Sequence, residues 1–475
     1  MNISKQELKA IFPKQKKIKN NVNKIVIDSR FAGQNDLFIA IIGDNNDGHN
    51  FIKNAINNGA TSIICEYIPD EMQNDFNKYK DIDFIIVENS LKALQQIAKW
   101  KREKLRQNNA TVIGITGNIG KTSTKEAIKV ILSNTFKTYA TNGNLNNHIG
   151  LPLTLANAPA DAEIVILEMG MSHIGEIDFL TKIAQPNIAV ITTIAPAHIG
   201  NFSNIHEVVK AKAEIFNGLN KNGLVILNEE NEFFEELKTL CHNRGNFELL
   251  TFGTAKSNAY INSYVANSNF TTDFDIVVNN KHIKSSVVGI GRHNVFNLLP
   301  AIIIADKLGI KTGKIAEQTK KIKIVNGRGN IENIVFNKKS ISLINDAYNS
   351  SPVSLKEAID ILEEFARQTN RRAVAIIGDM LELGVMSHKY HKDIADHLVK
   401  HNIKNVILVG NESKIIYNNL PSSMNKHHFM TTDELCEKIN NFLQNNDIAM
   451  IKASLGLRFE KIISKLKEEK ENNEK

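Results

Sequence analysis

The stretch GITGNIGKTSTKE, residues 114–126, decides the fold of the middle of this chain. It joins the apolar run TVIGIT (111–116), which we interpret as a strand, to the helix-forming run KTSTKEAIKVIL (121–132). In a strand–loop–helix unit of this kind, backbone N–H groups of the loop and of the helix N-terminus bind phosphate oxygens. We therefore predict a nucleotide-binding loop made of Gly117, Asn118, Gly120, Lys121, Thr122 and Ser123.

Two side chains of this loop carry its chemistry. Lys121 would reach the β- and γ-phosphates of a nucleoside triphosphate, and the Thr122 hydroxyl would be a ligand of Mg²⁺. The glycines have an uncommon spacing, because the usual pattern has its first glycine five residues before Gly120, where Ile115 stands. The spacing here is G-x-x-G-x-x-G-K-T, beginning at Gly114. This spacing distinguishes the loop from the commonest pattern of phosphate-binding loops, so fewer classes of nucleotide-binding protein fit it.

The composition predicts a soluble protein of several domains. At 475 residues, 42% apolar and 23% charged, the chain has room for two to four globular domains. The formal charge of +7 lacks basic runs interleaved with aromatic residues, so we expect no nucleic-acid partner. Three distant cysteines predict reduced thiols, and no apolar run approaches the roughly 18–20 residues of a membrane span. The N-terminus has no apolar signal region, so we expect a cytoplasmic protein without membrane insertion.

The pattern of apolar runs divides the chain into three parts. Residues 1–108 contain short runs separated by polar helical stretches, and a helix over residues 90–107 ends this part. Residues 109–325 contain unbroken apolar runs typical of parallel strands buried on both faces, with an antiparallel insert over residues 246–290. Residues 326–475 repeat the alternation of strand and helix. We predict an α/β protein with a small N-terminal domain, a central doubly wound parallel sheet like that of P-loop ATPases, and a Rossmann-like C-terminal domain.

Three further residues point to the place where the loop lies. Glu168 closes the apolar run EIVILE, and His198 follows the run NIAVITT. Both would lie at the carboxyl edge of the parallel sheet, where ligands bind. Lys212 lies at the centre of the apolar stripe of a helix that Asn204 or Ser203 would cap. A buried ammonium is costly, so Lys212 needs a partner or a changed chemistry, unless its stem extends along the surface to solvent.

The spacing of the loop resembles that of the Mur ligases and the folylpolyglutamate synthases. The central part resembles the middle domain of the Mur ligases, ATP-dependent amide ligases of peptidoglycan synthesis. The resemblance implies that Lys212, in AKAEIF, is carbamylated, and that Glu168 and His198 belong to the same site, where Thr122, Glu168, His198 and Lys212 would hold two Mg²⁺ ions. The segment GRHN with Asn297 resembles G-x-H-N-x-x-N, which implies that Asn294 and Asn297 approach the adenine of ATP. Lys121, His198 and Lys212 are the implied catalytic residues.

Four stretches resemble the family branch that joins D-alanyl-D-alanine to UDP-N-acetylmuramoyl-tripeptide. They are DSR (28–30) with DLFIAIIG and DGHNFI, then TNGNLNNHIGLPLTL (141–155), NDAYNSSP (345–352) and GDMLELG (378–384). The resemblance implies further nucleotide contacts from Arg328 and Asp346. It also implies that the N-terminal domain binds the uridine nucleotide. The implied substrate contacts are Ser29, Arg30, Asn144, Asn146, Tyr348, Asn349 and Lys452.

The sequence departs from the family near its C-terminus. KASLGLR stands where the family often has K-G-S-R, so Ala453 and Leu455 replace a glycine and an arginine. An arginine contact to the dipeptide is therefore in doubt, and Arg458 is a candidate substitute. We also place Asp379 at a strand end, facing the cleft of Asp346 and Lys452 or capping a helix.

The resemblance implies an ATP-dependent carbon–nitrogen ligase that works through an acyl phosphate, as a monomer. Two other readings stay open at this point. One is the family member that adds the third amino acid to UDP-muramyl dipeptide, and the other is a nucleotide-binding regulator without catalysis. The intact Lys121, Thr122, Glu168, His198 and Lys212 oppose the regulator, and the DSR segment opposes a folate-type relative.

Overall fold

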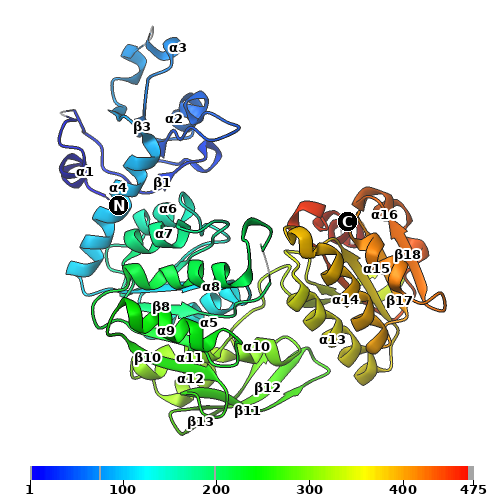
Figure 1. The fold of residues 1–475 in the computed structure, drawn as a ribbon. Helices are drawn as coiled ribbons and strands as arrows, with labels where there is room; N and C mark the ends of the chain where they lie inside the picture. The colour runs from blue at the N-terminus through cyan, green and yellow to red at the C-terminus, as the bar shows by residue number, and fades with distance from the viewer. Residues whose placement is uncertain (1–2, 16, 74–75, 197–198, 469–475) are drawn as a thin grey trace.

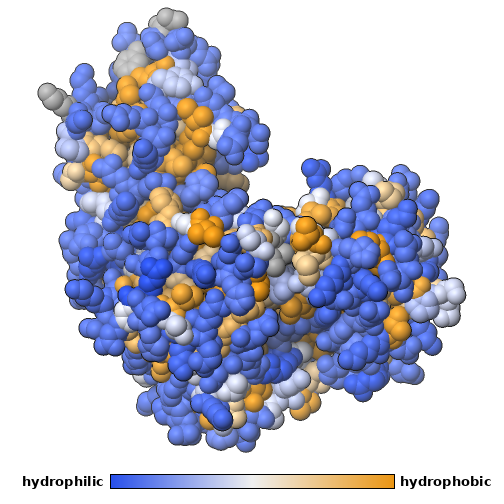
Figure 2. Space-filling view, viewed as in Figure 1, coloured by the Kyte–Doolittle hydropathy of each residue, from blue (hydrophilic) through white to orange (hydrophobic). Residues whose placement is uncertain are grey.

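The computed structural model describes residues 3–15, 17–73, 76–196 and 199–468. Within these residues the chain forms three β-sheets, one in each of three consecutive parts (Figure 1). The N-terminal part lies above the central part, and the C-terminal part lies beside the central part. Figure 2 shows a broad hollow between the N-terminal and C-terminal parts. The predicted α/β class with three domains is confirmed, whereas the exact boundaries at residues 108 and 325 stay predictions.

The N-terminal domain has a parallel sheet with strand order β1-β2-β3-β4. Neighbouring residues of one strand enter two cores, because Leu37 and Ile39 face the core shared with the central domain and Phe38 faces a second core. The strands are Ile25–Val26 (β1), Leu37–Ile39 (β2), Ser62–Cys65 (β3) and Asp83–Ile86 (β4). The helices are Lys5–Ile11 (α1), Ile52–Asn57 (α2), Asp70–Gln73 (α3) and Ser90–Gln107 (α4), and Ser29–Phe31 (η1) is a 3₁₀ turn.

Helix α4 connects this domain to the central one, and its bounds match the predicted residues 90–107. Arg102 is buried and donates from Nε to the carbonyl of Ala184 (2.8 Å) and from Nη2 to that of Gln185 (2.8 Å). The Asn157 side chain of the central domain bonds both the N–H and the carbonyl of Ile25, each at 2.9 Å. The apolar residues around these contacts form one continuous core across the two domains.

The central domain is built on a nine-stranded sheet with the order β13-β12-β11-β10-β9-β8-β5-β7-β6. The inner parallel strands β5, β7, β8 and β9 are mostly apolar and buried, because both faces of the sheet are covered here. Val112 of β5 faces the core with α4 and α6, and Ile113 faces the core with α5 and α11. The strands are Thr111–Thr116 (β5), Thr138–Ala140 (β6), Ile164–Glu168 (β7), Ile188–Ile191 (β8), Leu224–Asn228 (β9), Glu248–Gly253 (β10), Ala259–Ala266 (β11), Thr271–Val278 (β12) and Lys281–Val288 (β13). The helices are Lys121–Ser133 (α5), Gly150–Ala156 (α6), Glu176–Ala184 (α7), Ile205–Ala213 (α8), Phe234–Arg244 (α9), Arg292–Phe296 (α10), Leu299–Lys307 (α11) and Thr312–Thr319 (α12).

The expected antiparallel insert over residues 246–290 is only partly antiparallel. β10 pairs in parallel with β9 and β11 pairs in parallel with β10, so the parallel sheet continues into this segment. Only β11, β12 and β13 are antiparallel to one another. The loop between β11 and β12 reaches the next domain, where Phe270 packs edge-on against Phe365 at 5.2 Å between ring centroids.

The C-terminal domain has a six-stranded sheet with the order β14-β15-β19-β16-β17-β18, parallel except for β14. The strands are Asn330–Phe336 (β14), Lys339–Asn345 (β15), Ala373–Gly378 (β16), Asn405–Val409 (β17), Asn425–Phe429 (β18) and Asp447–Lys452 (β19). The helices are Pro352–Thr369 (α13), Ser387–Lys400 (α14), Ser413–Asn419 (α15), Thr432–Lys438 (α16) and Glu460–Lys467 (α17).

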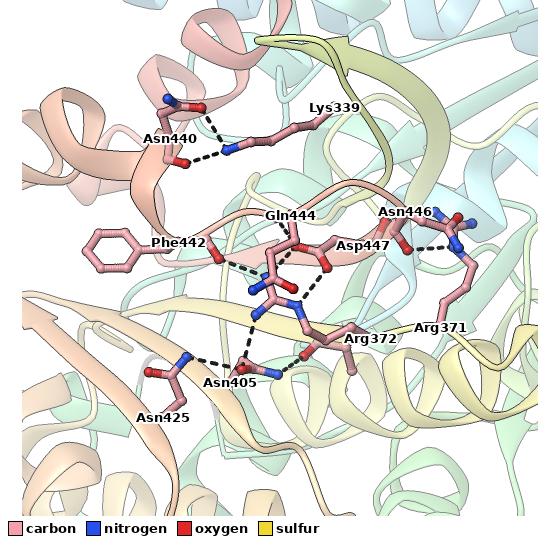
Figure 3. A network of polar contacts seen from close by, with 11 residues as sticks. Lys339, Arg371, Arg372, Asn405, Asn425, Asn440, Phe442, Gln444, Asn446 and Asp447 are labelled. Carbon is pink, nitrogen blue, oxygen red and sulfur yellow. Dashed lines mark hydrogen bonds and ion pairs between the residues drawn. The ribbon is translucent and has the colours of Figure 1, made fainter.

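A polar network closes the amino ends of these strands (Figure 3). Arg372 binds Asp447 with two hydrogen bonds of 2.8 and 2.6 Å, and it also donates to the Phe442 carbonyl at 2.9 Å. Its third nitrogen donates to Asn405 Oδ1 at 3.3 Å. Because ligands of parallel sheets bind at the carboxyl ends of the strands, this network is structural, and the site lies at the opposite edge.

Two general expectations can be compared with the structure. The three cysteines are free, with Cys65 and Cys241 buried, as the sequence predicts for reduced thiols. Among the described residues no helix combines the length and the apolar character needed to cross a membrane.

Candidate active site

The glycine-rich loop runs from the end of β5 to the start of α5, as predicted. Gly117 has φ +143° and Gly120 has φ +85°, conformations that residues with a Cβ rarely adopt. A Cβ at Gly117 would overlap Thr192 Oγ1, the hydroxyl that donates to the carbonyl of Ile119 at 2.6 Å. The Lys121 ammonium folds back over the loop and donates to the carbonyls of Gly117 (2.8 Å) and Asn118 (3.2 Å). The loop conformation is therefore stabilised by glycine backbone geometry and by contacts within the protein.

This shape gives a first testable prediction. Gly117→Ala should raise the Kd for ADP at least about tenfold, because the added methyl group forces Thr192 and the loop apart. Isothermal titration calorimetry measures this change. Gly309→Ala is the matched control, since Gly309 has φ +76° but no atom within 4 Å of the place a Cβ would occupy, so the control carries the backbone strain without the clash. Equal ADP affinity in the two variants would contradict the prediction.

Glu168 connects the loop to the segment after β6. It is buried at the carboxyl end of β7, where its Oε2 accepts a hydrogen bond from the Thr122 hydroxyl at 3.0 Å. Its Oε1 accepts from Asn146 Nδ2, also at 3.0 Å. A buried carboxylate beside a hydroxyl is a hard-oxygen donor set, which fits Mg²⁺ better than a softer ion. His198, predicted for the same place, lies outside the residues that the structure describes.

Lys212 is on α8, and Asn204 caps this helix by accepting from the N–H of Glu207 at 3.1 Å. Only 3% of Lys212 is exposed, so the predicted inward direction is correct and the surface alternative is wrong. Burial lowers the pKa of its ammonium well below the usual value, and the positive charge of Lys121 lowers it further. The charges of Glu168, Glu176 and Glu214 act in the opposite direction. Burial therefore favours the unprotonated form of the Lys212 amine.

A cavity of about 130 Å³ lies between the central and C-terminal domains. It brings the phosphate loop into contact with residues more than two hundred positions later in the chain. From the predicted nucleotide and substrate contacts it collects Asn118, Gly120, Ser123, Asn297, Arg328, Asp346, Tyr348, Asn349 and Lys452. The Arg328 guanidinium lies over the Tyr348 ring, 4.1 Å from its centroid.

Two of these predicted residues bind each other. Lys452 ends β19 and donates to Asp346 Oδ2 at 2.5 Å and to the carbonyl of Asn349 at 3.0 Å. Lys452 is buried and Asp346 is partly buried. Burial raises the pKa of the Asp346 carboxyl, while the charges of Lys452 and Arg328 oppose this rise. The pair places a cation and an anion at the same wall of the cavity, opposite the phosphate loop.

The cavity also contains residues that the sequence reasoning missed. Burial lowers the pKa of His293 to about 4, with Lys452 adding to the effect, so this imidazole is neutral at physiological pH. Burial raises the pKa of Glu357 to about 7, against the charge of Lys452. His293 is the histidine of the GRHN segment and was available as a signal, because it directly precedes Asn294. Glu357 lies inside α13, where no local pattern distinguishes it from a solvated residue.

Two other predicted residues do not line this cavity. The Asn294 side chain donates to the carbonyl of Ile290 at 3.0 Å, within its own turn. Asp379 accepts at Oδ1 from the N–H of Ser413 at 2.7 Å and so caps α15, which makes the expectation that it shares a cleft with Asp346 wrong. The carboxylate instead lines a second hollow together with Arg458.

A cavity of about 670 Å³ lies between the N-terminal and central domains. Asp28 and Phe31 line it from one side, and Asn142 and Leu145 from the other. The neighbouring predicted contacts are not among its lining residues: Ser29 is buried, and Arg30 is exposed and paired with Asp28 at 2.6 Å. Asn144 is exposed next to Leu145, and Asn146 is held by Glu168.

Leu455, one of the two departures from the family motif, lines a cavity of about 220 Å³ that adjoins the nucleotide cavity at Tyr348. Its lining includes Tyr348, Leu381, Ser454 and Leu455, and Leu455 is half exposed. Arg458 lines the hollow with Asp379 and not this cavity, and its part as a substitute for the family arginine stays a prediction. Ala453 is buried and would touch a Cβ at Gly378.

Comparison with protein families gives three matches along the chain. The matching profiles are "Mur ligase family, catalytic domain" over residues 21–102, "Mur ligase middle domain" over residues 115–305, and "Mur ligase, glutamate ligase domain" over residues 332–455. Together they span all three sheets.

Individual proteins give the same result over almost the full length. The chain is 35% identical over 444 residues to the UDP-N-acetylmuramoyl-tripeptide–D-alanyl-D-alanine ligase of Rickettsia prowazekii, which covers 93% of this chain and 95% of the relative. A crystal structure of MurF from Acinetobacter baumannii superposes with a TM-score of 0.84 at 27% identity, covering 98% of each chain. The crystal structure of the MurF ligase of Thermotoga maritima in complex with ADP superposes with a TM-score of 0.76 at 25% identity. This match covers 95% of this chain and 99% of that one.

Proposed function

Because this chain belongs to the Mur ligase family, we propose that it joins D-alanyl-D-alanine to UDP-N-acetylmuramoyl-tripeptide at the expense of ATP. The products are UDP-N-acetylmuramoyl-pentapeptide, ADP and phosphate, in the cytoplasmic synthesis of peptidoglycan precursors. The observation that carries this proposal is the cavity in which the phosphate loop faces the Asp346–Lys452 pair. Relatives named for this reaction span nearly the whole chain, which favours it over addition of the third amino acid.

The chemistry requires that a carboxylate oxygen become a leaving group. The terminal carboxylate of the tripeptide attacks the γ-phosphate of ATP, which gives an acyl phosphate and ADP. The amine of D-alanyl-D-alanine then attacks the acyl carbon, and the tetrahedral intermediate expels phosphate. Such steps depend on positioning and on charge stabilisation rather than on covalent help from the protein.

The residues of this chain have distinct parts in these steps. The N–H groups of the loop and the Lys121 ammonium offset the charge where the two anions meet. The Asp346–Lys452 pair and the Arg328–Tyr348 stack form the opposite wall, which closes over the nucleotide and excludes water. Water must be excluded, because it would otherwise hydrolyse the acyl phosphate.

Mg²⁺ fits the donor set around Glu168. Two ions, held by Thr122, Glu168, His198 and a carbamylated Lys212, would neutralise the phosphate charge when bound. The carbamate is favoured by the burial of Lys212, which lowers the pKa of its ammonium, because only an unprotonated amine adds CO₂. The addition forms an N–C bond, releases one proton and gives an anion that attracts Mg²⁺, whereas the ammonium form of Lys212 would repel it.

The uridine nucleotide would occupy the cavity between the first two domains, beside Asp28 and Phe31. The dipeptide would lie near Tyr348, Asn349 and Lys452, where the loop of GDMLELG approaches the central domain. At this approach the N–H of Gly200 donates to the carbonyl of Glu382 at 2.9 Å. The expected oligomeric state is a monomer.

The test is phosphate release from ATP by the purified chain, with UDP-muramyl tripeptide and D-alanyl-D-alanine, omitting each in turn. We expect turnover only when all three are present. Turnover with UDP-muramyl dipeptide and a free diamino acid would instead assign the preceding step of the pathway. Tight ATP binding without turnover with either pair would overturn the proposal, and Ala453 and Leu455 would be examined first.

A further inference from the structure

A cluster of metal-binding side chains lies outside the proposed active site, on the C-terminal domain. His397 is in the last turn of α14, and His401, four residues after it, is the C-cap residue of the helix, so both imidazoles lie on one face of the helix. Asp360 comes from the neighbouring helix α13, three residues after Glu357. One potential ligand atom from each of these three side chains lies within 4.8 Å of the other two.

The contacts inside the cluster converge on one oxygen. Asp360 Oδ1 is 2.6 Å from His397 Nε2 and 3.3 Å from His401 Nε2. The two imidazole rings lie 4.3 Å apart between centroids, tilted by 32°. The side chains of His397 and His401 are 17% and 23% exposed, whereas that of Asp360 is 50% exposed, so the two imidazoles are partly shielded and the carboxylate is open to solvent.

We propose that Asp360, His397 and His401 form a binding site for a divalent transition-metal ion, with Zn²⁺ as the first candidate. Two imidazole nitrogens and one carboxylate oxygen are ligands that Zn²⁺ prefers, and a water molecule would complete a four-coordinate shell. The ion would take the place of the proton that is shared between His397 Nε2 and Asp360 Oδ1. Mg²⁺ does not fit this donor set, because it requires mainly oxygen ligands.

The site would join two helices that support the nucleotide cavity. The N-terminal turns of α13 carry Ser351, Ser354 and Glu357, which line that cavity. Helix α14 carries the buried His391, whose Nε2 accepts from the N–H of Met380 in the GDMLELG loop at 3.1 Å. An ion between Asp360 and the two histidines would therefore stabilise the C-terminal domain without touching the reacting groups.

The test uses Co²⁺ as a spectroscopic probe on the full chain, in buffer that contains excess Mg²⁺ to occupy the proposed nucleotide site. We expect visible d–d absorption that saturates with one equivalent of Co²⁺ and is displaced by Zn²⁺. His401→Gln should weaken Co²⁺ binding at least tenfold, and Asp360→Asn should also weaken it. His388→Gln, on the exposed side of the same helix, is the control and should bind like the wild type.

Thermal unfolding supplies a second measurement. Zn²⁺ should raise the melting temperature of the wild type and of His388→Gln, because an ion that binds only the native state stabilises it. Zn²⁺ should leave the melting temperature of His401→Gln unchanged. The melting temperature of this variant without metal verifies that it folds. Absence of saturable Co²⁺ absorption in the wild type, or equal binding by wild type and His401→Gln, would overturn the proposal. ATP turnover by His401→Gln reports separately on the ligase reaction.

Discussion

Lys121→Ala is expected to lower the rate of ATP-dependent phosphate release by at least about 10³-fold, which corresponds to about 4 kcal/mol of transition-state stabilisation. The Lys121 ammonium lies at the phosphate loop, and the substitution removes its charge from the place where carboxylate and γ-phosphate meet. No other described lysine or arginine belongs to the loop itself, so the charge has no substitute there. Steady-state kinetics under saturating substrates measures the loss.

The same variant should remain folded. Within the described part of the chain, the Lys121 ammonium donates to two carbonyls of its own loop, and burial already lowers its pKa. Lys129→Ala is the matched control, because Lys129 is on the exposed face of the same helix and pairs only with Glu126 at 3.9 Å. If Lys121→Ala folds normally and its rate of phosphate release falls less than tenfold, the proposed stabilisation of phosphate charge by Lys121 is excluded.

Lys212→Ala is expected to lower turnover by about 10²–10³-fold, because it removes the anion that a carbamate would supply at the Glu168 side of the site. A short carboxylic acid such as acetate should restore part of the activity, since a free carboxylate can occupy the space that the side chain leaves. A merely structural role for Lys212 would give no recovery with acetate. The measurement is kcat as a function of acetate concentration.

Lys210→Ala is the control for this experiment, since Lys210 is on the same helix α8 but exposed. It should keep wild-type activity and show no response to acetate. Lys212→Arg should be inactive and should not be rescued, because arginine keeps a positive charge and leaves no space for acetate. Full activity of Lys212→Ala would show that turnover does not require a carbamate on Lys212.

The features that the sequence predicted correctly are local ones. The phosphate loop is specified by a strand, glycines and a helix within sixteen residues, and α4 is specified by its own periodic pattern. The burial of Lys212 followed from its position in an apolar stripe. The resemblance to the Mur ligases, read from short motifs, is confirmed by the family matches along the chain.

The features that could not be predicted depend on contacts between distant segments. Asp346 and Lys452 are 106 positions apart, and they meet because β15 and β19 are neighbours in the sheet. Asp379 also ends a strand of this sheet, yet the N–H of Ser413 on α15 binds its carboxylate. Glu357 belongs to the site only because two domains enclose it. A strand end predicts the edge of a sheet but not the cavity that a side chain enters.

The continuous core of the first two domains has a consequence for how the chain unfolds. Arg102 and Asn157 form polar contacts between the two domains, to the backbone of Ala184 and of Ile25 respectively. Apolar side chains from both domains pack into the same cluster. Separating these domains would expose that cluster to water, whereas the C-terminal sheet has cores of its own, to which the central domain adds only a few side chains. The chain therefore has three domains by topology, but we expect the N-terminal and central domains to unfold together as one cooperative unit and the C-terminal domain as another.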